Sequence, residues 1–483
     1  MAAPGLRQTR RIEWALSDAN TKSPVRDFVS ARAALADLAV RTLSEAPKLS
    51  AAEQVVTLAV PVGDVGVFDW LRAQQTGPKL YWSGRDDGVE VAAVGVADLQ
   101  TSAVAEESSV LWERLSLLSD SGPETRYYGG MRFDPSRETG AGWAEFGAHR
   151  FVLPRFELRR EGGASILVFN LVLPRDAGQR ERIMWEVENL RAPEAYREEM
   201  LPAPTDRMDL PDAAGWRTNV ETALAAFEEG PLEKVVLARR AGLFFDEDLD
   251  PLLLIEQLKA RTPGCFHFYF EPEDGVAFLG ASPERLYRRE DRSIKSEAVA
   301  GTRPRGESAA DDDELGRELL SSAKDLSEHS YVRVSIEEKL GALCEVLEVD
   351  GRASEMKLAR GRHLVSRVRG TLREGVTDTD VLRALHPTPA VGGYPREEAV
   401  QVIRGAEAFD RGWYAGPVGW VGSDAAEFAV GIRSGLARGR ELALFSGAGI
   451  VAGSVPDEEW AEIEHKIGDF TRVFGLEPAH ARS

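Results

Sequence analysis

The sequence predicts an α+β fold in which helices pack on large, mostly antiparallel sheets. Apolar or alternating runs that are typical of strands recur over residues 54–175 and again beyond residue 216. In the second half, segments with helical apolar spacing stand between these runs. Turn-forming residues separate neighbouring strands, and strands interleaved with helices in this way indicate an α+β architecture.

The first half should begin with a helix and continue as a sheet. An amphipathic helix is expected over 29–45, and the segment 181–229 should be helical in two pieces. The Pro-rich segment 201–215 between those pieces is, by composition, the best candidate for a domain boundary. Strands are expected at 55–60, 79–84, 89–97, 150–160 and 164–175.

The second half should alternate strands and helices. The segment 298–306, "AVAGTRPRG", is expected to be a Gly/Pro loop, and 385–395, "LHPTPAVGGYP", a shaped loop. Strands are expected at 234–245, 266–270, 276–282, 284–290, 414–422, 427–438 and 441–453. Helices are expected at 250–261, 312–346, 376–386, 396–408 and 457–474.

Composition limits the class of protein. The net charge is −20 and the isoelectric point is near 5.0, which argues against nucleic acid or an anionic membrane as partner. An anionic substrate would therefore need a local cluster of cations. No apolar run reaches the roughly 18 residues that span a bilayer, and no signal peptide is expected. Cys265 and Cys344 are the only cysteines, so we expect neither a disulfide framework nor zinc, and a cytoplasmic location.

Two residues are candidates for proton transfer. In "EKVVLARR", strand alternation places Lys234 on the same face as Val236 and Ala238. This lysine is either a solvated residue at a strand end or a partly desolvated base. In "FLGASPERLYRRE", Glu284 follows the kink at Ser282-Pro283. It is either an exposed turn residue or a carboxyl aimed into a cavity.

Two helices carry carboxylates that could hold a cation. Glu328 lies one turn after Lys324 in "KDLSEHSYV". In "PDEEWAEIEHKIGDF", Glu459, Glu462 and Lys466 share one helix face. Two carboxylates so close repel each other unless a cation binds, and Mg²⁺ usually takes one or two carboxylates while keeping waters. The alternative is that both helices present solvated, charged faces.

Other residues could hold an anion. Glycines permit close approach of the backbone and expose N–H groups, and a guanidinium can bind a carboxylate through two hydrogen bonds. The candidates of this kind are Gly301, Thr302, Thr388, Arg433, Gly447 and Gly449.

Nine motifs in order resemble the chorismate-utilising enzymes. They are "EKVVLARR", "GASPERLY", "AGTRPRG", "KDLSEH", "HPTPAVGG", "DRGWYAGPVGW", "GIRSG", "GAGIVAGS" and "EEWAEIEHK", and they span 215–475. The resemblance implies one large α+β domain over 1–483, with two large, mostly antiparallel sheets packed together and helices outside. Residues 1–200 would complete the sheets and 215–475 would form the catalytic region, which removes the boundary considered at 201–215.

The resemblance also implies roles for residues in a Mg²⁺-dependent reaction. Lys234 matches the lysine that activates water for attack at ring C2, and Glu284 matches the acid that protonates the departing C4 hydroxyl. Glu328 and Glu462 match the Mg²⁺ ligands, with Glu459 close by. The positions that match substrate contacts are Gly301, Thr302, His386, Thr388, Tyr414, Arg433, Gly447, Gly449 and Lys466.

Within the family, the motifs resemble isochorismate synthases most. The lysine at 234 and "HPTPAVGG" differ from the amine-forming branch, anthranilate synthase component I and aminodeoxychorismate synthase component I. Salicylate synthase is the nearer alternative, because it makes isochorismate and then eliminates pyruvate. A non-catalytic binding protein is the alternative from another class. The expected partner is chorismate, the expected assembly a monomer or weak homo-oligomer, and the expected pathway menaquinone or siderophore biosynthesis.

Overall fold

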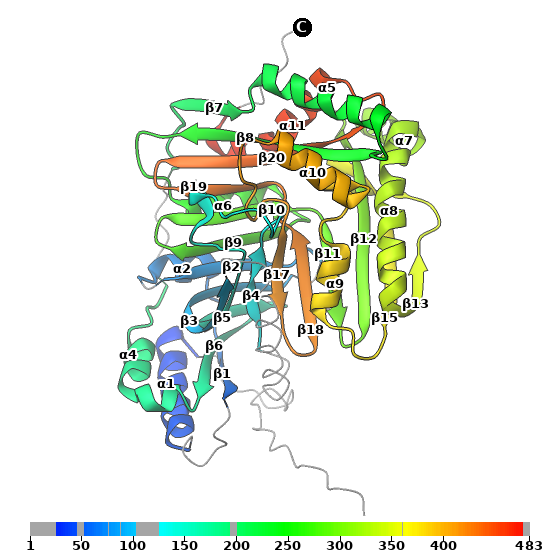
Figure 1. Ribbon diagram of the computed structural model, residues 1–483. Coiled ribbons are helices and arrows are strands. Elements are labelled where there is room, and N and C mark those ends of the chain that lie inside the picture. The colour runs from blue at the N-terminus through cyan, green and yellow to red at the C-terminus, as the bar shows by residue number, and fades with distance from the viewer. Residues whose placement is uncertain are drawn as a thin grey trace, which may run out of the picture.

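Runs of consecutive strands and helices follow one another along the chain (Figure 1). The computed structural model describes residues 26–45, 53–75, 77–86, 88–102, 125–193, 200–359 and 361–476. Its helices are α1 (Phe28–Glu45), α2 (Val67–Ala73), α4 (Arg180–Glu188), α5 (Ala213–Glu229), α6 (Pro251–Arg261), α7 (Ala309–Ser321), α8 (Ala323–Leu343), α9 (Asp378–Leu385), α10 (Arg396–Ala406) and α11 (Pro456–Thr471). None of the helices in these ranges is long and apolar enough to cross a membrane.

The strands fall into an N-terminal and a C-terminal set. The first set is β1 (Gln54–Val62), β2 (Lys79–Ser83), β3 (Glu90–Ser102), β4 (Tyr127–Met131), β5 (His149–Glu161), β6 (Ala164–Leu173) and β7 (Asp206–Leu210). The second set is β8 (Lys234–Phe244), β9 (Phe266–Glu273), β10 (Val276–Ser282), β11 (Arg285–Glu290), β12 (Ser293–Pro304), β13 (Cys344–Val349), β14 (Ser354–Lys357), β15 (Gly361–Leu372), β16 (Gly393–Tyr394), β17 (Pro417–Val421), β18 (Ala425–Val430), β19 (Ser434–Arg438) and β20 (Glu441–Val451).

The strands form two large antiparallel sheets that are joined by N-terminal strands. The first sheet runs in the order β7–β8–β20–β19–β10–β9. The second runs in the order β4–β17–β18–β11–β12–β15. The link passes from β9 through β2, β3 and β5 to β4. Strands β8, β19 and β20 run roughly horizontally in Figure 1, whereas β17 and β18 run roughly vertically. The strands of the two sheets therefore lie at a steep angle to one another.

An aromatic contact joins the two sheets, and helices cover them. Trp413, just before β17, packs with ring centroids 5.7 Å from Phe270 on β9 and 6.2 Å from Phe278 on β10. Helices α7 and α8 cover β12 and β15, while α5, α10 and α11 cover β8 and β20 (Figure 1). Helix α1 packs on β1 and α4. The α+β fold with two mostly antiparallel sheets packed together and helices outside is therefore confirmed.

The loop expected at 298–306 is wrong. Residues 298–304 form the end of β12, which pairs with β15, a strand that the sequence had not indicated. The Gly/Pro signal instead marks a bulge, because Gly301 has a φ of +69° and the register shifts between Ala300 and Thr302.

The structure differs from three further expectations about elements. The single helix expected at 312–346 is broken at Ser322, whose hydroxyl accepts a hydrogen bond from the Asp325 amide and begins α8. The segment 201–215, considered at first as a domain boundary, contains strand β7, which pairs with β8. The strand expected at 427–438 is divided into β18 and β19, which belong to different sheets.

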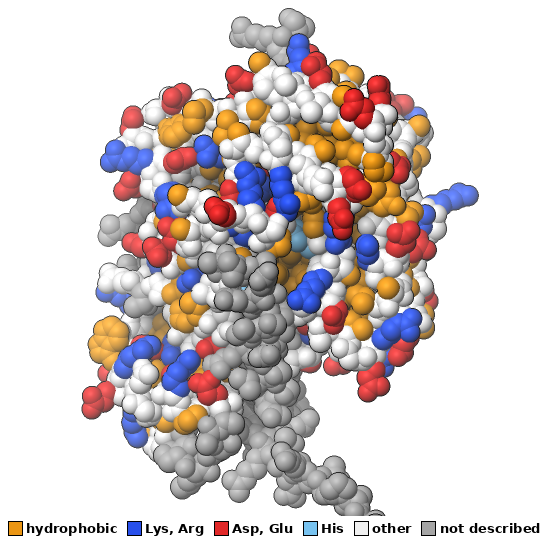
Figure 2. Space-filling model, in the orientation of Figure 1, with side chains coloured by type: hydrophobic (Ala, Val, Ile, Leu, Met, Phe, Trp, Pro, Cys, Tyr) orange, Lys and Arg blue, Asp and Glu red, His pale blue; other side chains and the backbone are white. Residues whose placement is uncertain are grey.

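Charged groups of both signs share the surface. On the face in Figure 2, acidic and basic side chains are interspersed. The net charge of −20 is therefore not gathered into one acidic patch on that face.

Candidate active site

A pocket forms where the chain passes twice between the two sheets. Glu284 lies in the connection from β10, in the first sheet, to β11, in the second. Arg433 lies in the connection that returns from β18 to β19. The lining residues are Val236, Pro283, Glu284, Val299, Ala300, Gly301, Thr302, Glu328, His363, Ala390, Val391, Tyr414, Ile432, Arg433, Ser446, Gly447, Gly449, Glu462 and Lys466. Most of the candidates named from the sequence therefore meet in one place.

Lys234 is fully buried at the start of β8, beside this pocket. Its Nζ lies 3.0 Å from Glu328 Oε1, so the lysine is held in an ion pair from α8. Gly449 makes this approach possible, because a Cβ at that position would clash with Glu328 Oε1 and lie 3.1 Å from Lys234 Cε. A buried charge without a partner is costly, which explains why the lysine and the carboxylate occur together.

The three candidate metal carboxylates each face a lysine. Besides the Lys234–Glu328 pair, Lys324 Nζ lies 2.8 Å from Glu459. Lys466 Nζ lies 2.7 Å from Glu462 and donates to the Gly447 carbonyl at 2.9 Å. In the described part of the chain, no three carboxylate, histidine or cysteine side chains converge as a ready-made metal cage. Glu328 and Glu462 line the pocket, and two carboxylates completed by waters are a donor set that fits Mg²⁺.

Glu284 is a carboxyl that holds its proton. Its side chain is buried, and burial raises its pKa to about 8. The charge of Glu297 adds to this rise, whereas Lys234 and Lys466 oppose it. The backbone of Glu284 is fixed, since its amide donates to Ser282 Oγ at 3.3 Å and its carbonyl accepts from the Val430 amide. The group is thus protonated at neutral pH and able to act as an acid.

The pocket lining also carries polar groups that could hold an anion. The Thr302 hydroxyl lies 3.1 Å from His363 Nδ1, and burial together with nearby Arg433 lowers the pKa of His363 to about 3. The imidazole is therefore neutral. Arg433 donates to Asp469 at 2.6 Å and keeps a place in the pocket lining. His363 and Asp469 were not foreseen, because each stands alone in its element without a local motif.

Besides Lys234, three of the candidate site residues do not line the pocket. His386 bonds through Nε2 to the Phe133 carbonyl at 3.0 Å, and burial lowers its pKa to about 4. Thr388 is buried, and its hydroxyl has no partner among the described residues. Glu459 is buried against Lys324, and burial raises the pKa of its carboxyl. These three residues therefore lie outside the pocket lining.

The pocket between the two sheets combines a protonated carboxyl with several cationic side chains, and the buried Lys234 lies beside it. A family model described as "Chorismate binding enzyme" matches residues 41–475. The chain belongs to this family of chorismate-binding enzymes.

Named relatives cover almost the whole chain. Isochorismate synthase 2, chloroplastic, of Arabidopsis thaliana is 35% identical over 93% of this chain and 89% of its own. An isochorismate synthase of Bacillus subtilis is 33% identical, covering 85% of this chain and 90% of its own. The solved structure of the menaquinone-specific isochorismate synthase of Escherichia coli matches with a TM-score of 0.79 and 29% identity, over 92% of this chain and 100% of that one.

Proposed function

We propose that this protein is an isochorismate synthase, which converts chorismate to isochorismate. The observation that carries the proposal is a protonated Glu284 in the pocket lining, with the buried Lys234 beside the pocket, held against the lining residue Glu328 and acting on Glu284 by its charge. An exchange of hydroxyl groups needs an acid for the departing oxygen and a base for the incoming water. The relatives named as isochorismate synthases support the same activity over most of the chain.

In the proposed reaction, water adds at ring C2 and the C4 hydroxyl leaves. Lys234 accepts the proton from the attacking water as the new C–O bond forms at C2. The ring double bonds shift, the C4–O bond breaks, and Glu284 donates its proton so that the hydroxyl departs as water. One water enters and one leaves, so the reaction is an isomerisation. Lys234 has to react as the neutral amine, and its ion pair with Glu328 must loosen before the attack.

The remaining residues are proposed to bind the substrate's carboxylates and the metal. Mg²⁺ held by Glu328 and Glu462, with Glu459 close by, would neutralise carboxylate charge on the substrate. Direct binding of chorismate is proposed for the pocket residues Gly301, Thr302, Tyr414, Arg433, Gly447, Gly449 and Lys466. His386 and Thr388 are proposed to shape the loop that carries Ala390 and Val391, which line the pocket.

We further propose that the chain acts as one unit over 1–483, in which residues 1–200 complete the sheets around the catalytic region 215–475. The pairing of β2 with β9 and of β4 with β17 supports this proposal, because it joins N-terminal strands to strands of the two large sheets. Both cysteines are buried and free, which fits the proposed cytoplasmic location. The product would enter menaquinone or siderophore biosynthesis.

The test is incubation of the purified protein with chorismate and Mg²⁺, with products separated by liquid chromatography. We expect a mixture of chorismate and isochorismate, no turnover after removal of Mg²⁺ by a chelator, and no amino product when ammonium is added. Salicylate with pyruvate would assign the protein to the salicylate synthases instead. An amino product would contradict the role of Lys234.

A further inference from the structure

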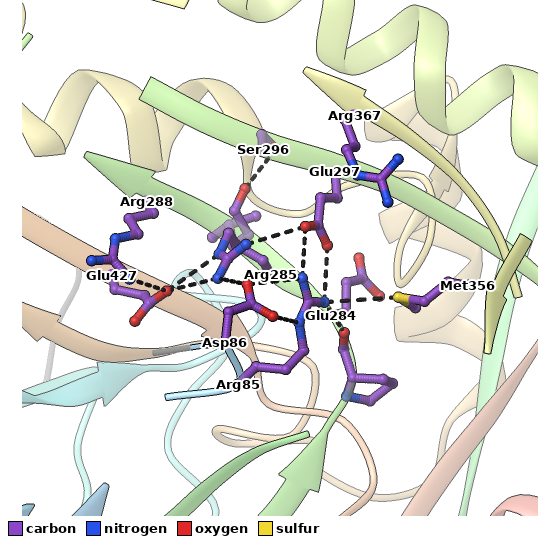
Figure 3. Close-up of polar contacts among 12 residues, drawn as sticks. Arg85, Asp86, Glu284, Arg285, Arg288, Ser296, Glu297, Met356, Arg367 and Glu427 are labelled. Atoms are coloured by element: carbon purple, nitrogen blue, oxygen red, sulfur yellow. Dashed lines mark hydrogen bonds and ion pairs between the residues drawn. The ribbon is translucent and has the colours of Figure 1, made fainter. Parts of the chain in front are cut away.

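An arginine of the N-terminal region contacts the segment that carries Glu284. Arg85 lies in the loop between β2 and β3, and its Nη1 donates to the Pro283 carbonyl at 2.7 Å (Figure 3). Pro283 directly precedes Glu284. The contact therefore links the β2–β3 loop to the β10–β11 connection, where the chain crosses from the first sheet to the second.

Carboxylates hold the Arg85 guanidinium in one orientation. Its Nη1 and Nη2 donate to the two oxygens of Glu297 on β12, at 2.9 and 2.7 Å. Its Nε donates to Asp86 at 3.1 Å. The side chains of Arg85 and Glu297 are each only 9% exposed. A buried bidentate pair of this kind fixes direction as well as distance, so the Pro283 carbonyl is tied to β12.

Arg285 repeats the arrangement on the other side of Glu284. Its guanidinium donates to Glu297 at 3.1 Å, to Asp86 at 2.7 Å and to Glu427 on β18 at 3.0 Å (Figure 3). The residues on both sides of Glu284 are thus anchored, one through its carbonyl and one through its side chain. Both anchors end on the same carboxylate, Glu297.

We propose that Arg85 is a positioning residue for Glu284. Through the Pro283 carbonyl and Glu297, the β2–β3 loop sets the place and direction of the carboxyl that protonates the departing hydroxyl. This inference rests on the proposed function, and it gives the N-terminal part of the chain a role in the chemistry. Arg85 does not line the pocket, so its effect on turnover is indirect.

The test compares Arg85→Gln and Arg85→Lys with the wild-type enzyme in the isochorismate assay. Since a misplacement of about 1 Å at the reacting group can cost on the order of 100-fold, we expect Arg85→Gln to lower kcat about 10- to 100-fold. KM should change less than about twofold, because the pocket residues proposed to bind chorismate are untouched. Arg85→Lys should recover part of kcat, since an ammonium can reach one partner but cannot make the bidentate contact.

Arg155→Gln is the matched control. Arg155 on β5 is also buried and pairs with Asp176 at 2.7 Å and Glu186 at 3.0 Å, so its loss removes comparable ion pairs away from Glu284. If both glutamine variants lower kcat in proportion to lost thermal stability, Arg85 is structural only and the proposal is overturned. An unchanged kcat in a folded Arg85→Gln overturns it as well. If Arg85→Gln does not fold, a lowered kcat at constant KM in Arg85→Lys supports it and an unchanged kcat overturns it. A wild-type protein that makes no isochorismate overturns the proposed function, and this inference with it.

Discussion

Two carboxyl groups that line the pocket, Glu284 and Glu462, have pKa values shifted in opposite directions. On the sheet crossing, burial raises the pKa of Glu284 to about 8, with Glu297 adding to the rise. On α11, burial acts on Glu462 too, but Lys466 at 2.7 Å, together with the charge of Lys324 and an electrostatic contribution from His363, outweighs it and lowers the pKa of that carboxyl. Glu284 thus becomes a proton donor because its carboxyl is buried and burial prevails over the two lysine charges that oppose it. Glu462 stays an anion because its side chain is partly exposed and in contact with Lys466.

Removing the acid should have the largest effect. We expect Glu284→Gln to lower kcat about 100- to 10,000-fold, because general acid catalysis contributes factors of that size. The affinity for chorismate, measured by titration calorimetry, should change little. Glu271→Gln is the matched control, since Glu271 on β9 is another buried carboxyl whose pKa is raised by burial, and it lies outside the pocket lining. Comparable loss in both variants would remove Glu284 from the mechanism.

The anionic side of the pocket can be separated by its metal affinity. Glu462→Gln should weaken Mg²⁺ binding at least about 10- to 100-fold, the range seen when groups around a metal site are removed. Glu459→Gln should have a smaller effect, because Glu459 faces Lys324 and does not line the pocket. Titration calorimetry with Mg²⁺ alone measures both without reference to turnover. Equal losses would mean that Glu459 is a direct ligand and that the pocket closes further around the ion.

Local sequence signals located the groups on both sides, but not what surrounds them. The alternation of "EKVVLARR" placed Lys234 on a strand, and the spacing of Glu459, Glu462 and Lys466 placed them on one helix. Periodicity reports neighbours a few residues apart. Periodicity could not predict the contact of Arg85 with Pro283, because the two residues are 198 positions apart.

Elements were missed for a related reason. Strand β15, "GRHLVSRVRGTL", has basic residues among its apolar ones and lacks a continuous apolar run. It is recognisable as a strand only beside β12, where Thr302 pairs with His363. The sheet crossings that place Glu284 and Arg433 depend likewise on which strands pair, and strand pairing is decided by contacts across the whole chain rather than by any one segment.

The absence of a side chain at Gly449 can be tested next. We expect Gly449→Ala to lower kcat about tenfold, because the new methyl group would displace Glu328 from its place against Lys234. The fold should be kept, since Gly449 lies within β20. Gly405→Ala in α10 is the control, because a Cβ there meets nothing within 4 Å. Full activity in Gly449→Ala would show that the Lys234–Glu328 contact is not needed for turnover.

The smallest expected effect concerns the pH at which Glu284 loses its proton. Below about pH 8 the carboxyl is protonated and can act as the acid; above it, kcat/KM should fall about tenfold per pH unit. The charge of Glu297 contributes to the raised pKa of Glu284, so Glu297→Gln should move this falling limb to lower pH. Glu427→Gln is the control, because Glu427 contacts the same Arg285 but is not among the groups that shift Glu284. If the falling limb of the kcat/KM profile moves equally in both variants, the shift comes from the loss of arginine anchoring. If it moves only in Glu297→Gln, the charge of Glu297, which Arg85 and Arg285 hold in place, raises the pKa of Glu284.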